Sequence, residues 1–254
     1  METILRAENI SRSFKINDNT TVDALKDINL EVEQNKLVVL RGRSGSGKTT
    51  LMKCVLGLTK HEGTVTLDGA AIDRTNIDRL SFATCEHSFF PALTPAAHRD
   101  FYAAHFPRFN GKRFQSLMDF FSLPMDKKLR SFSAGMQNQF EVIMSLSQGA
   151  DYILMDEPFA GNDIFNREDF YKVLLGILTE QETVLLSTHL IEEVKDCISR
   201  AVLIREGVIV GDCTADALEE SGKDLMTYIK ETYHYRPDRV SQALDALTDG
   251  EEDT

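Results

Sequence analysis

The chain has 254 residues, of which 42% are apolar and 27% charged, and 40 Asp and Glu against 28 Lys and Arg give a formal net charge of −12. An acidic chain lacks the basic face that nonspecific binding to nucleic acid or anionic lipid requires. Its apolar runs are far shorter than the ~20 residues of a membrane-spanning helix. The composition therefore predicts a globular protein without a nucleic-acid partner and without a segment that crosses a bilayer.

The N-terminus and the cysteines favour a cytoplasmic address. Residues 1–9 carry an acid at Glu2 and no apolar stretch behind a basic region, which disfavours a secretory signal or a transit peptide. The four cysteines lie far apart and form no C-x-x-C pair. They are Cys54, Cys85, Cys197 and Cys213. Reduced thiols are therefore expected, with neither a disulfide nor a structural metal.

Strand signals dominate the N-terminal part of the chain, and helical signals follow. Apolar residues alternate with polar ones at residues 28–32, and residues 37–40 form a continuous apolar run typical of a buried parallel strand. A short alternating strand follows at residues 63–69. From residue 94 to about 146, Phe, Leu and Met recur at helical spacing and predict an inserted helical region.

The second half of the chain alternates between the two kinds of element. We expect a strand, a helix and two further strands, in this order, at residues 151–155, 163–178, 183–187 and 201–204. Such alternation predicts an α/β fold built on a parallel sheet. After about Gly222 the pattern weakens, and residues 241–254, which hold five acids and no base, are expected to form a solvated tail.

A glycine-rich loop directly follows the strand at residues 37–40. Residues 42–49 read G-R-S-G-S-G-K-T, which matches G-x-x-x-x-G-K-[ST], and a helical pattern begins behind them. Glycines let successive backbone N–H groups turn toward a β-phosphate, and the helix adds the positive end of its dipole. Lys48 is expected to reach the β- and γ-phosphates, and Thr49 to place its hydroxyl on Mg²⁺. The residues expected to hold the triphosphate are Gly42, Ser44, Gly45, Ser46, Gly47, Lys48, Thr49 and Thr50.

Two adjacent carboxylates follow the apolar strand predicted at residues 151–155. Ligands of parallel sheets bind at the carboxyl ends of the strands, which is where Asp156 and Glu157 stand. We expect Asp156 to hold Mg²⁺ through water, and Glu157 to orient or deprotonate an attacking water. Taken alone, the pair is equally compatible with an ordinary polar turn at a strand end.

With these two elements located, the chain resembles the nucleotide-binding subunit of ABC transporters over roughly residues 2–220. Residues 131–136, S-F-S-A-G-M, look like a variant of the family's L-S-G-G-Q signature, with its serine 23 residues before Asp156. A signature serine and glycine at a helix start, here Ser133 and Gly135, offer a hydroxyl, N–H groups and the helix dipole to a γ-phosphate. By the resemblance, they serve the ATP site of a second subunit.

Three more positions fit the order of the family's motifs. Residues 159–163 resemble the D-loop, with Asp163 in its Asp position, and His189 looks like the switch histidine after the next strand. Phe14 is placed like the aromatic side chain that stacks on adenine. The resemblance implies that His189 contacts the γ-phosphate and keeps the water and Glu157 in register.

The chain also departs from the family pattern. The Q-loop glutamine falls on Cys85 by spacing, with Glu86 beside it, and neither residue is glutamine. Glu86 could supply an oxygen ligand for Mg²⁺ in its place, and whether Cys85 or Glu86 takes the Q-loop role stays open. The signature carries substitutions at three of its five places, Phe132, Ala134 and Met136.

The resemblance implies a P-loop NTPase fold with a RecA-like parallel core sheet, an N-terminal antiparallel β subdomain and a helical subdomain inserted at about residues 88–147. The ATP-binding domain would span residues 1–222, and residues 223–254 would be a C-terminal extension. Two such subunits, identical or different, would close around ATP and Mg²⁺ and drive a separate transmembrane permease subunit. The protein would then lie peripherally on the cytoplasmic face of the membrane.

The helical segment gives a weaker indication about the transporter. Its details look more like a bacterial exporter than an importer, although neither the substrate nor the direction of transport follows from the residues. In the family that the chain resembles, the helical subdomain docks the membrane subunit. Phe89 and Phe90 are candidates for that contact in this chain.

Two other classes of protein share part of this pattern. A soluble ABC-type ATPase without a membrane channel, for example one that acts in cluster assembly, would carry the same motifs. A small-molecule kinase or a GTPase would share the phosphate loop. The chain has no N-K-x-D element that reads guanine, however, and kinases lack a signature and a switch histidine in this order. A transport ATPase is therefore the leading hypothesis.

Overall fold

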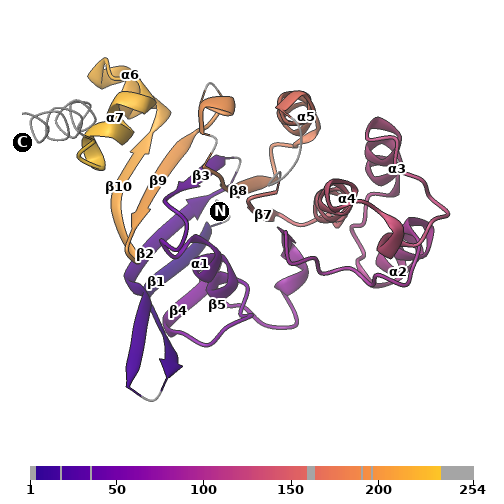
Figure 1. Cartoon of the computed structure of the whole chain (residues 1–254), viewed down its shortest axis with the longest axis horizontal. Helices are drawn as coiled ribbons and strands as arrows, with labels where there is room; N and C mark the ends of the chain where they lie inside the picture. Colours follow the sequence, from indigo (N-terminus) through magenta and orange to yellow (C-terminus); the bar gives the residue numbers. More distant parts are fainter. Residues whose placement is uncertain are drawn as a thin grey trace, which may run out of the picture. The chain divides into compact units, whose positions relative to one another are not determined.

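The computed structural model describes residues 4–17, 19–34, 36–158, 164–189, 191–195 and 197–235 (Figure 1). The chain divides into two compact units, Met1–Ala215 and Asp216–Thr254. The acidic tail expected at residues 241–254 and the D-loop expected at residues 159–163 lie outside the described residues.

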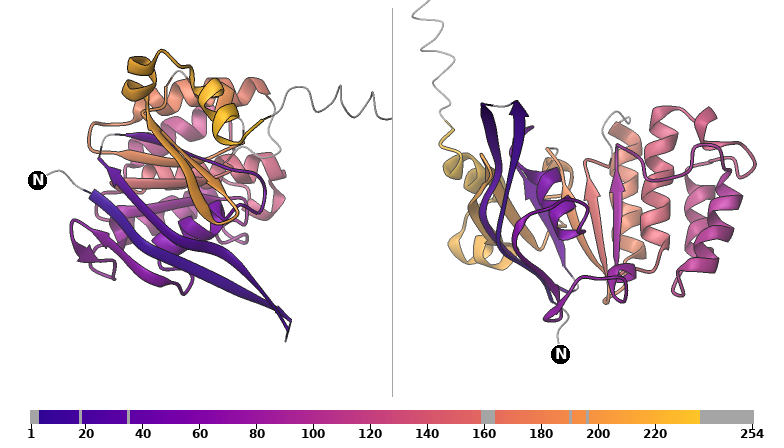
Figure 2. Two further views of the ribbon diagram at one scale, coloured as in Figure 1. Left: turned by 90° about the vertical axis from the view of Figure 1, so that its left-hand side faces the viewer. Right: turned by 90° about the horizontal axis from the view of Figure 1, so that it is seen from below.

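An antiparallel sheet forms first along the chain, with strand order β2-β1-β4-β5. Its strands are β1 (Ile4–Asn17), β2 (Thr20–Glu33), β4 (Glu62–Leu67) and β5 (Ala70–Ala71). Along β2, Ile28, Leu30 and Val32 are buried and alternate with more exposed residues, so one face of the sheet packs on the core. The β1–β2 hairpin, drawn in indigo, extends beyond the rest of the first unit (Figure 2). The strands predicted at residues 28–32 and 63–69 are confirmed.

The second sheet has six strands in the order β10-β9-β3-β8-β7-β6. All neighbouring strands run parallel except β10 and β9. The strands are β3 (Leu37–Arg41), β6 (Leu80–Thr84), β7 (Tyr152–Asp156), β8 (Thr183–Ser187), β9 (Arg200–Arg205) and β10 (Val208–Thr214). β7 and β8 are buried along their whole length, as expected for parallel strands that are covered on both faces. The predicted α/β fold with a parallel core sheet is confirmed.

Helices connect the parallel strands. α1 (Lys48–Val55) follows β3, and α5 (Ile164–Ile177) connects β7 with β8. The predicted helical insertion contains α2 (Pro95–His105), α3 (Gly111–Phe120) and α4 (Ala134–Ser147). These three helices begin at Thr94, Asn110 and Ser133, whose side chains each accept from the backbone N–H three residues further on.

Short helical segments complete the described structure. Single 3₁₀ turns lie at Ile77–Arg79, Leu129–Ser131 and Ile191–Glu193, and the last helices are α6 (Ala215–Ser221) and α7 (Leu225–Thr232). Among the helices of the described residues, none combines the length and the apolar character that a bilayer span requires.

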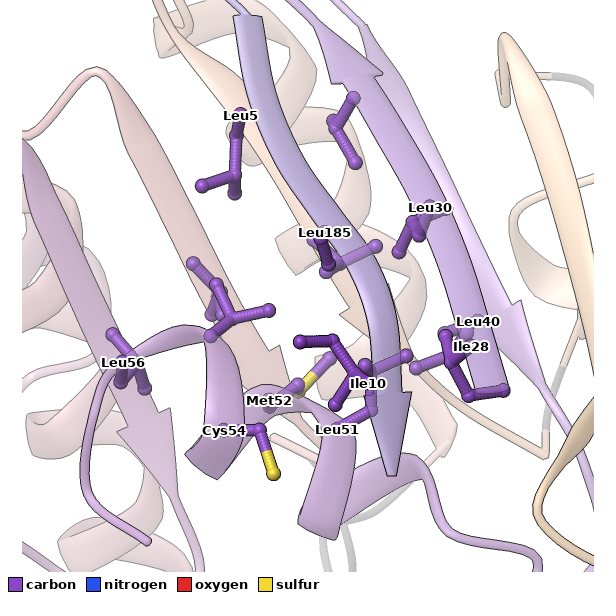
Figure 3. Close-up of a cluster of buried hydrophobic side chains, with 14 of the residues drawn as sticks. Leu5, Ile10, Ile28, Leu30, Leu40, Leu51, Met52, Cys54, Leu56 and Leu185 are labelled. Atoms are coloured by element: carbon purple, nitrogen blue, oxygen red, sulfur yellow. The ribbon is translucent and has the colours of Figure 1, made fainter. Parts of the chain in front are cut away.

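A buried apolar cluster joins the antiparallel sheet to the helix behind the glycine-rich loop. Figure 3 shows Leu5, Ile10 and Ile28 of that sheet together with Leu51 and Met52 of α1. Leu51 and Met52 are completely buried. Since burying a side chain of this size contributes about 2 kcal/mol, the cluster fixes α1 and, with it, the loop that precedes this helix.

Candidate active site

The loop between β3 and α1 needs glycine at two positions. Gly45 and Gly47 have φ angles of +76° and +108°, in the left-handed region that other residues rarely adopt. A Cβ atom on Gly47 would lie 2.6 Å from the Ala24 carbonyl oxygen. Gly47 is also the N-cap of α1 and provides no side-chain cap, so N–H groups in the first turn of the helix, among them those of Thr49 and Thr50, are left for a ligand. Ser44 lies at the exposed tip of the loop.

Buried polar atoms accompany these N–H groups. Ser46 is buried, and its Oγ has no hydrogen-bond partner within the part of the chain that the structure describes. Lys48 is buried as well, and its Nζ donates to the carbonyl oxygens of Gly42 at 2.9 Å and of Arg43 at 3.2 Å. A buried hydroxyl without a partner and a buried ammonium group fit an anionic ligand such as a triphosphate.

Asp156 ends β7 and links the loop to the sheet. Its Oδ2 accepts from Thr49 Oγ1 and its Oδ1 from Ser187 Oγ, both at 2.5 Å. Thr49 and Asp156, the two residues predicted to hold Mg²⁺, therefore lie together, and both provide the hard oxygen atoms that suit this ion. Ser187 is not among the predicted site residues. Its position opposite Asp156, at the end of the neighbouring strand β8, is the signal that identifies it.

Glu157 lies between the two other residues predicted to be catalytic. Its Oε2 is 2.8 Å from His189 Nδ1, and its Oε1 is 3.9 Å from Lys48 Nζ. Because a carboxylate only accepts hydrogen bonds, His189 donates through Nδ1. The backbone of Glu157 has a φ of +46°, and its N–H donates to the carbonyl oxygen and to Oγ of Ser187, each at 3.1 Å. Ser187 thus holds Glu157 in a conformation that glutamate rarely adopts.

The loop after β6 supplies the residues at the Q-loop position. Cys85 Sγ lies 3.2 Å from the Glu157 carbonyl oxygen. Burial, and after it the charges of Asp156 and Glu157, raise the pKa of the Cys85 thiol, which therefore keeps its proton and can donate to that carbonyl. The Glu86 carboxylate accepts from Lys53 Nζ of α1 at 2.7 and 2.8 Å. A role for Glu86 as a ligand of Mg²⁺ stays a prediction.

The other predicted residues make contacts of their own. Ser133 is exposed and caps α4, and Gly135 lies in the first turn of this helix. Phe14 of β1 is 40% exposed, and the Arg12 guanidinium lies 4.4 Å from the centre of its ring. Asp163 lies outside the described residues. The structure therefore joins the phosphate loop to the ends of β7 and β8, while the roles of these four residues stay predictions.

Comparison with known proteins decides the family. A family model described as "ABC transporter" matches residues 25–160, which is more than half of the chain. The chain belongs to the ABC transporter family. The taurine import ATP-binding protein TauB of Jannaschia sp. is 30% identical to it over 219 residues, covering 82% of this chain and 77% of TauB. The lipopolysaccharide export system ATP-binding protein LptB of Haemophilus influenzae is 26% identical over 243 residues, covering 91% and 99%.

Solved structures of ATP-binding cassettes share the fold. An ATP-binding subunit of an ABC transporter superposes with a TM-score of 0.76 at 19% identity, covering 91% of this chain and 99% of that one. A dimeric cassette in a post-hydrolysis state with ADP and Pi superposes with a TM-score of 0.72 at 22% identity, covering 83% and 98%. Since ABC cassettes bind and hydrolyse ATP, the chain is an ATP-binding protein and an ATPase.

Proposed function

We propose that the chain hydrolyses ATP with Mg²⁺ held by Thr49 and Asp156 and with Glu157 as the general base, and that a pair of such subunits drives transport through a separate membrane subunit. One observation carries the proposal: Glu157 lies 2.8 Å from His189 and 3.9 Å from Lys48, beside the phosphate loop. The edge formed by the carboxyl ends of parallel strands is where ligands of such sheets bind.

The residues at the loop fit ATP and Mg²⁺. When bound, the ion neutralises charge on the β- and γ-phosphate oxygens. Lys48 would exchange its two carbonyl acceptors for phosphate oxygens, a change that its flexible side chain permits. The Ser46 hydroxyl would gain the partner that it lacks among the described residues. The Thr49 hydroxyl and the Asp156 carboxylate would face the ion.

Glu157 and His189 would act on the attacking water. A carboxylate oxygen of Glu157 would take a proton from the water as the water oxygen bonds to the γ-phosphorus, while the bond from this phosphorus to the bridging oxygen breaks and ADP leaves. His189 Nδ1 orients this carboxylate through its hydrogen bond at 2.8 Å. Ser187 keeps the backbone of Glu157 in place through two further hydrogen bonds. A positioned base of this kind contributes roughly 10²- to 10⁴-fold to the rate.

The signature supports the proposal that two subunits act together. Ser133 and Gly135 stand at the start of α4, a helix of 14 residues, where a hydroxyl, N–H groups and the helix dipole can face a γ-phosphate. Ser133 is exposed and so available to a second subunit. A dimeric cassette of the same fold supports the pairing, and Asp163 would belong to the same interface.

Relatives of both transport directions match the chain. TauB is an import protein and LptB an export protein, and their identities to this chain are 30% and 26%. Both names denote ATP-binding proteins of transport systems, which supports coupling to a membrane subunit and peripheral attachment to the membrane. We propose export as the direction of transport, because the sequence of the helical segment resembles bacterial exporters more than importers.

An exposed apolar patch on the helical insertion is the proposed contact with the membrane subunit. Phe90, Leu93 and Phe101 are 52%, 38% and 39% exposed, and the rings of Phe90 and Phe101 lie 5.8 Å apart. Phe89, the other candidate from the sequence, packs against Phe140 at 5.8 Å instead. Buried His98 accepts from the Phe90 N–H at 3.0 Å, which fixes the loop that carries the patch. Exposed aromatic side chains are typical of interfaces.

Replacing Lys48 with alanine tests the nucleotide site. The variant is expected to bind ATP about 10- to 100-fold more weakly, because a charge-assisted contact with phosphate is lost. Calorimetric titration with ATP and Mg²⁺ measures the change. Lys60→Ala is the matched control, since Lys60 is exposed and follows α1. Equal affinity of the Lys48→Ala protein and the unmodified protein would contradict the proposed site.

Replacing Phe90 and Phe101 with alanine tests the membrane partner. The unmodified chain, purified through a tag from detergent extracts of its own cells, is expected to bring a multi-span membrane protein with it. The double variant should lose this partner and keep its affinity for ATP, whereas Phe120→Ala, which removes a 45% exposed ring from α3, should keep both. Recovery of the unmodified chain in a purely soluble complex would favour a soluble ABC-type ATPase.

A further inference from the structure

A buried carboxyl group on α4 has no part in the site described above. Glu141 is 2% exposed and lies between Phe140 and Val142, which are apolar and buried. The helix packs against β6. Burial raises the pKa of the Glu141 carboxyl to about 7, because the charged form loses its hydration. An apolar side chain would avoid this cost, so the contacts of Glu141 must account for its presence.

Glu141 binds Ser88, in the loop that follows β6. Its Oε1 accepts from the Ser88 N–H at 3.0 Å and from Ser88 Oγ at 2.5 Å. Its Oε2 is buried and has no hydrogen-bond partner among the described residues. One oxygen atom therefore receives both donors of the same residue, and this geometry fixes the backbone of Ser88 as well as its side chain.

The same loop, which we call the β6 loop and define as residues 85–88, touches two other elements. Cys85 Sγ lies 3.2 Å from the carbonyl oxygen of Glu157, at the end of β7. Glu86 pairs with Lys53 of α1 at 2.7 Å. The β6 loop thus lies between the helix that follows the phosphate loop, the strand end that carries the general base, and α4.

The three contacts differ in strength, and the one with α4 is the strongest. A thiol is a weak hydrogen-bond donor. The side chain of Glu86 is 68% exposed, and an exposed ion pair contributes about 0–1 kcal/mol. The contact of Glu141 with Ser88 is partly buried and joins two donors to a carboxyl oxygen. Of these three contacts, the one made by Glu141 therefore contributes most to holding the β6 loop.

We propose that Glu141 is a positioning residue for the general base: by binding Ser88 it holds the β6 loop so that Cys85 meets the carbonyl group of Glu157. The backbone of Glu157 is then held on both sides, at its N–H by Ser187 and at its carbonyl by Cys85. Because its left-handed conformation is uncommon, this backbone needs such support. The inference rests on the proposed role of Glu157 and adds to it a residue that touches neither ATP nor water.

Steady-state ATPase kinetics of the full chain test this inference. In Glu141→Leu, which leaves the Ser88 N–H unpaired, kcat is expected to fall about tenfold while KM for ATP stays within about twofold, since only the positioning of the base is lost. Glu141→Gln keeps an acceptor oxygen and should retain most of kcat. Ser145→Ala removes a different buried polar group of α4, the Ser145 hydroxyl, and is the control that should keep full activity.

A second measurement reports on the β6 loop itself. In a Cys197→Ser background, where the other described thiols at Cys54 and Cys213 are buried, maleimide labels the exposed Cys85. Both Ser88→Ala and Glu141→Leu should speed this labelling, because the loop loses its anchor. A protein with both Ser88→Ala and Glu141→Leu should have the same labelling rate and the same kcat as Glu141→Leu alone, since both changes break the same contact.

Several results would overturn the inference. A folded Glu141→Leu protein with kcat within about twofold of the unmodified chain would do so, as would a Glu141→Gln protein that is as slow as the leucine variant. If Glu141→Leu does not fold, the inference is contradicted by a Ser88→Ala protein whose kcat and labelling rate equal those of the unmodified chain. Failure of the proposed role of Glu157 would appear separately, as full turnover in Glu157→Gln.

Discussion

Glu157→Gln is expected to lower kcat for ATP hydrolysis by about 100-fold or more and to leave ATP binding close to that of the unmodified chain. The glutamine keeps the size of the side chain and can still meet His189, but its amide oxygen does not take a proton from water at neutral pH. Lys48 and the loop before it, the residues proposed to hold the phosphates, keep their own contacts, such as those of Lys48 Nζ with the carbonyl oxygens of Gly42 and Arg43. Phosphate release at saturating ATP and Mg²⁺, with calorimetric titration for binding, measures the two effects.

The same variant also tests whether ATP closes a pair of subunits. Without hydrolysis, ATP and Mg²⁺ should keep the two proposed subunits together, so size-exclusion chromatography should show a dimer that persists with ATP and separates with ADP. Glu180→Gln is the control, because Glu180 is an exposed residue in the turn before β8. A Glu157→Gln protein that turns over ATP at the unmodified rate would remove Glu157 from the mechanism.

Most of the fold follows from local patterns in the sequence. A continuous apolar run at β3 and alternation at β2 reflect how many faces of each strand are covered, so they predicted a buried and a half-buried strand correctly. The glycine-rich loop was predicted from spacing alone, since only a few residue types permit its backbone. β10 was not predicted, because most of its residues are half-buried and a glycine interrupts its apolar residues.

Contacts between distant segments were harder to predict. Ser187 binds Asp156 because β8 lies beside β7. The sequences of these two strands do not predict that they are neighbours in the sheet. The pairing of Glu141 with Ser88 likewise joins residues that are far apart in the chain. Periodicity shows which face of an element is buried, but a buried polar residue gains its partner from tertiary packing. The site was therefore predictable at its motifs and not at the residues that support them.

Arg113→Ala is expected to destabilise the fold by about 3 kcal/mol, because it breaks a nearly buried ion pair whose arginine also donates to backbone carbonyl groups. Both side chains are nearly buried, with Arg113 11% and Glu182 10% exposed. The two Nη atoms of Arg113 donate to both Glu182 oxygens, and they also donate to the carbonyl oxygens of Leu146 and Ile177 at 2.9 and 2.7 Å. One side chain thus joins α3 to the end of α4, the end of α5 and the turn before β8.

Urea unfolding followed by circular dichroism measures this loss. Arg113→Lys should recover only part of the stability, since an ammonium group cannot make the forked contacts of a guanidinium. Arg99→Ala is the matched control: its ion pair with Asp100 is exposed, so its loss should cost less than about 1 kcal/mol. The double change at Arg113 and Glu182 should cost less than the sum of the single changes, because the second removes a carboxylate that the first leaves buried without its partner. Equal stability of Arg113→Ala and Arg99→Ala would contradict the prediction, because the pair of Arg113 with Glu182 would then contribute no more to the free energy of unfolding than an exposed pair.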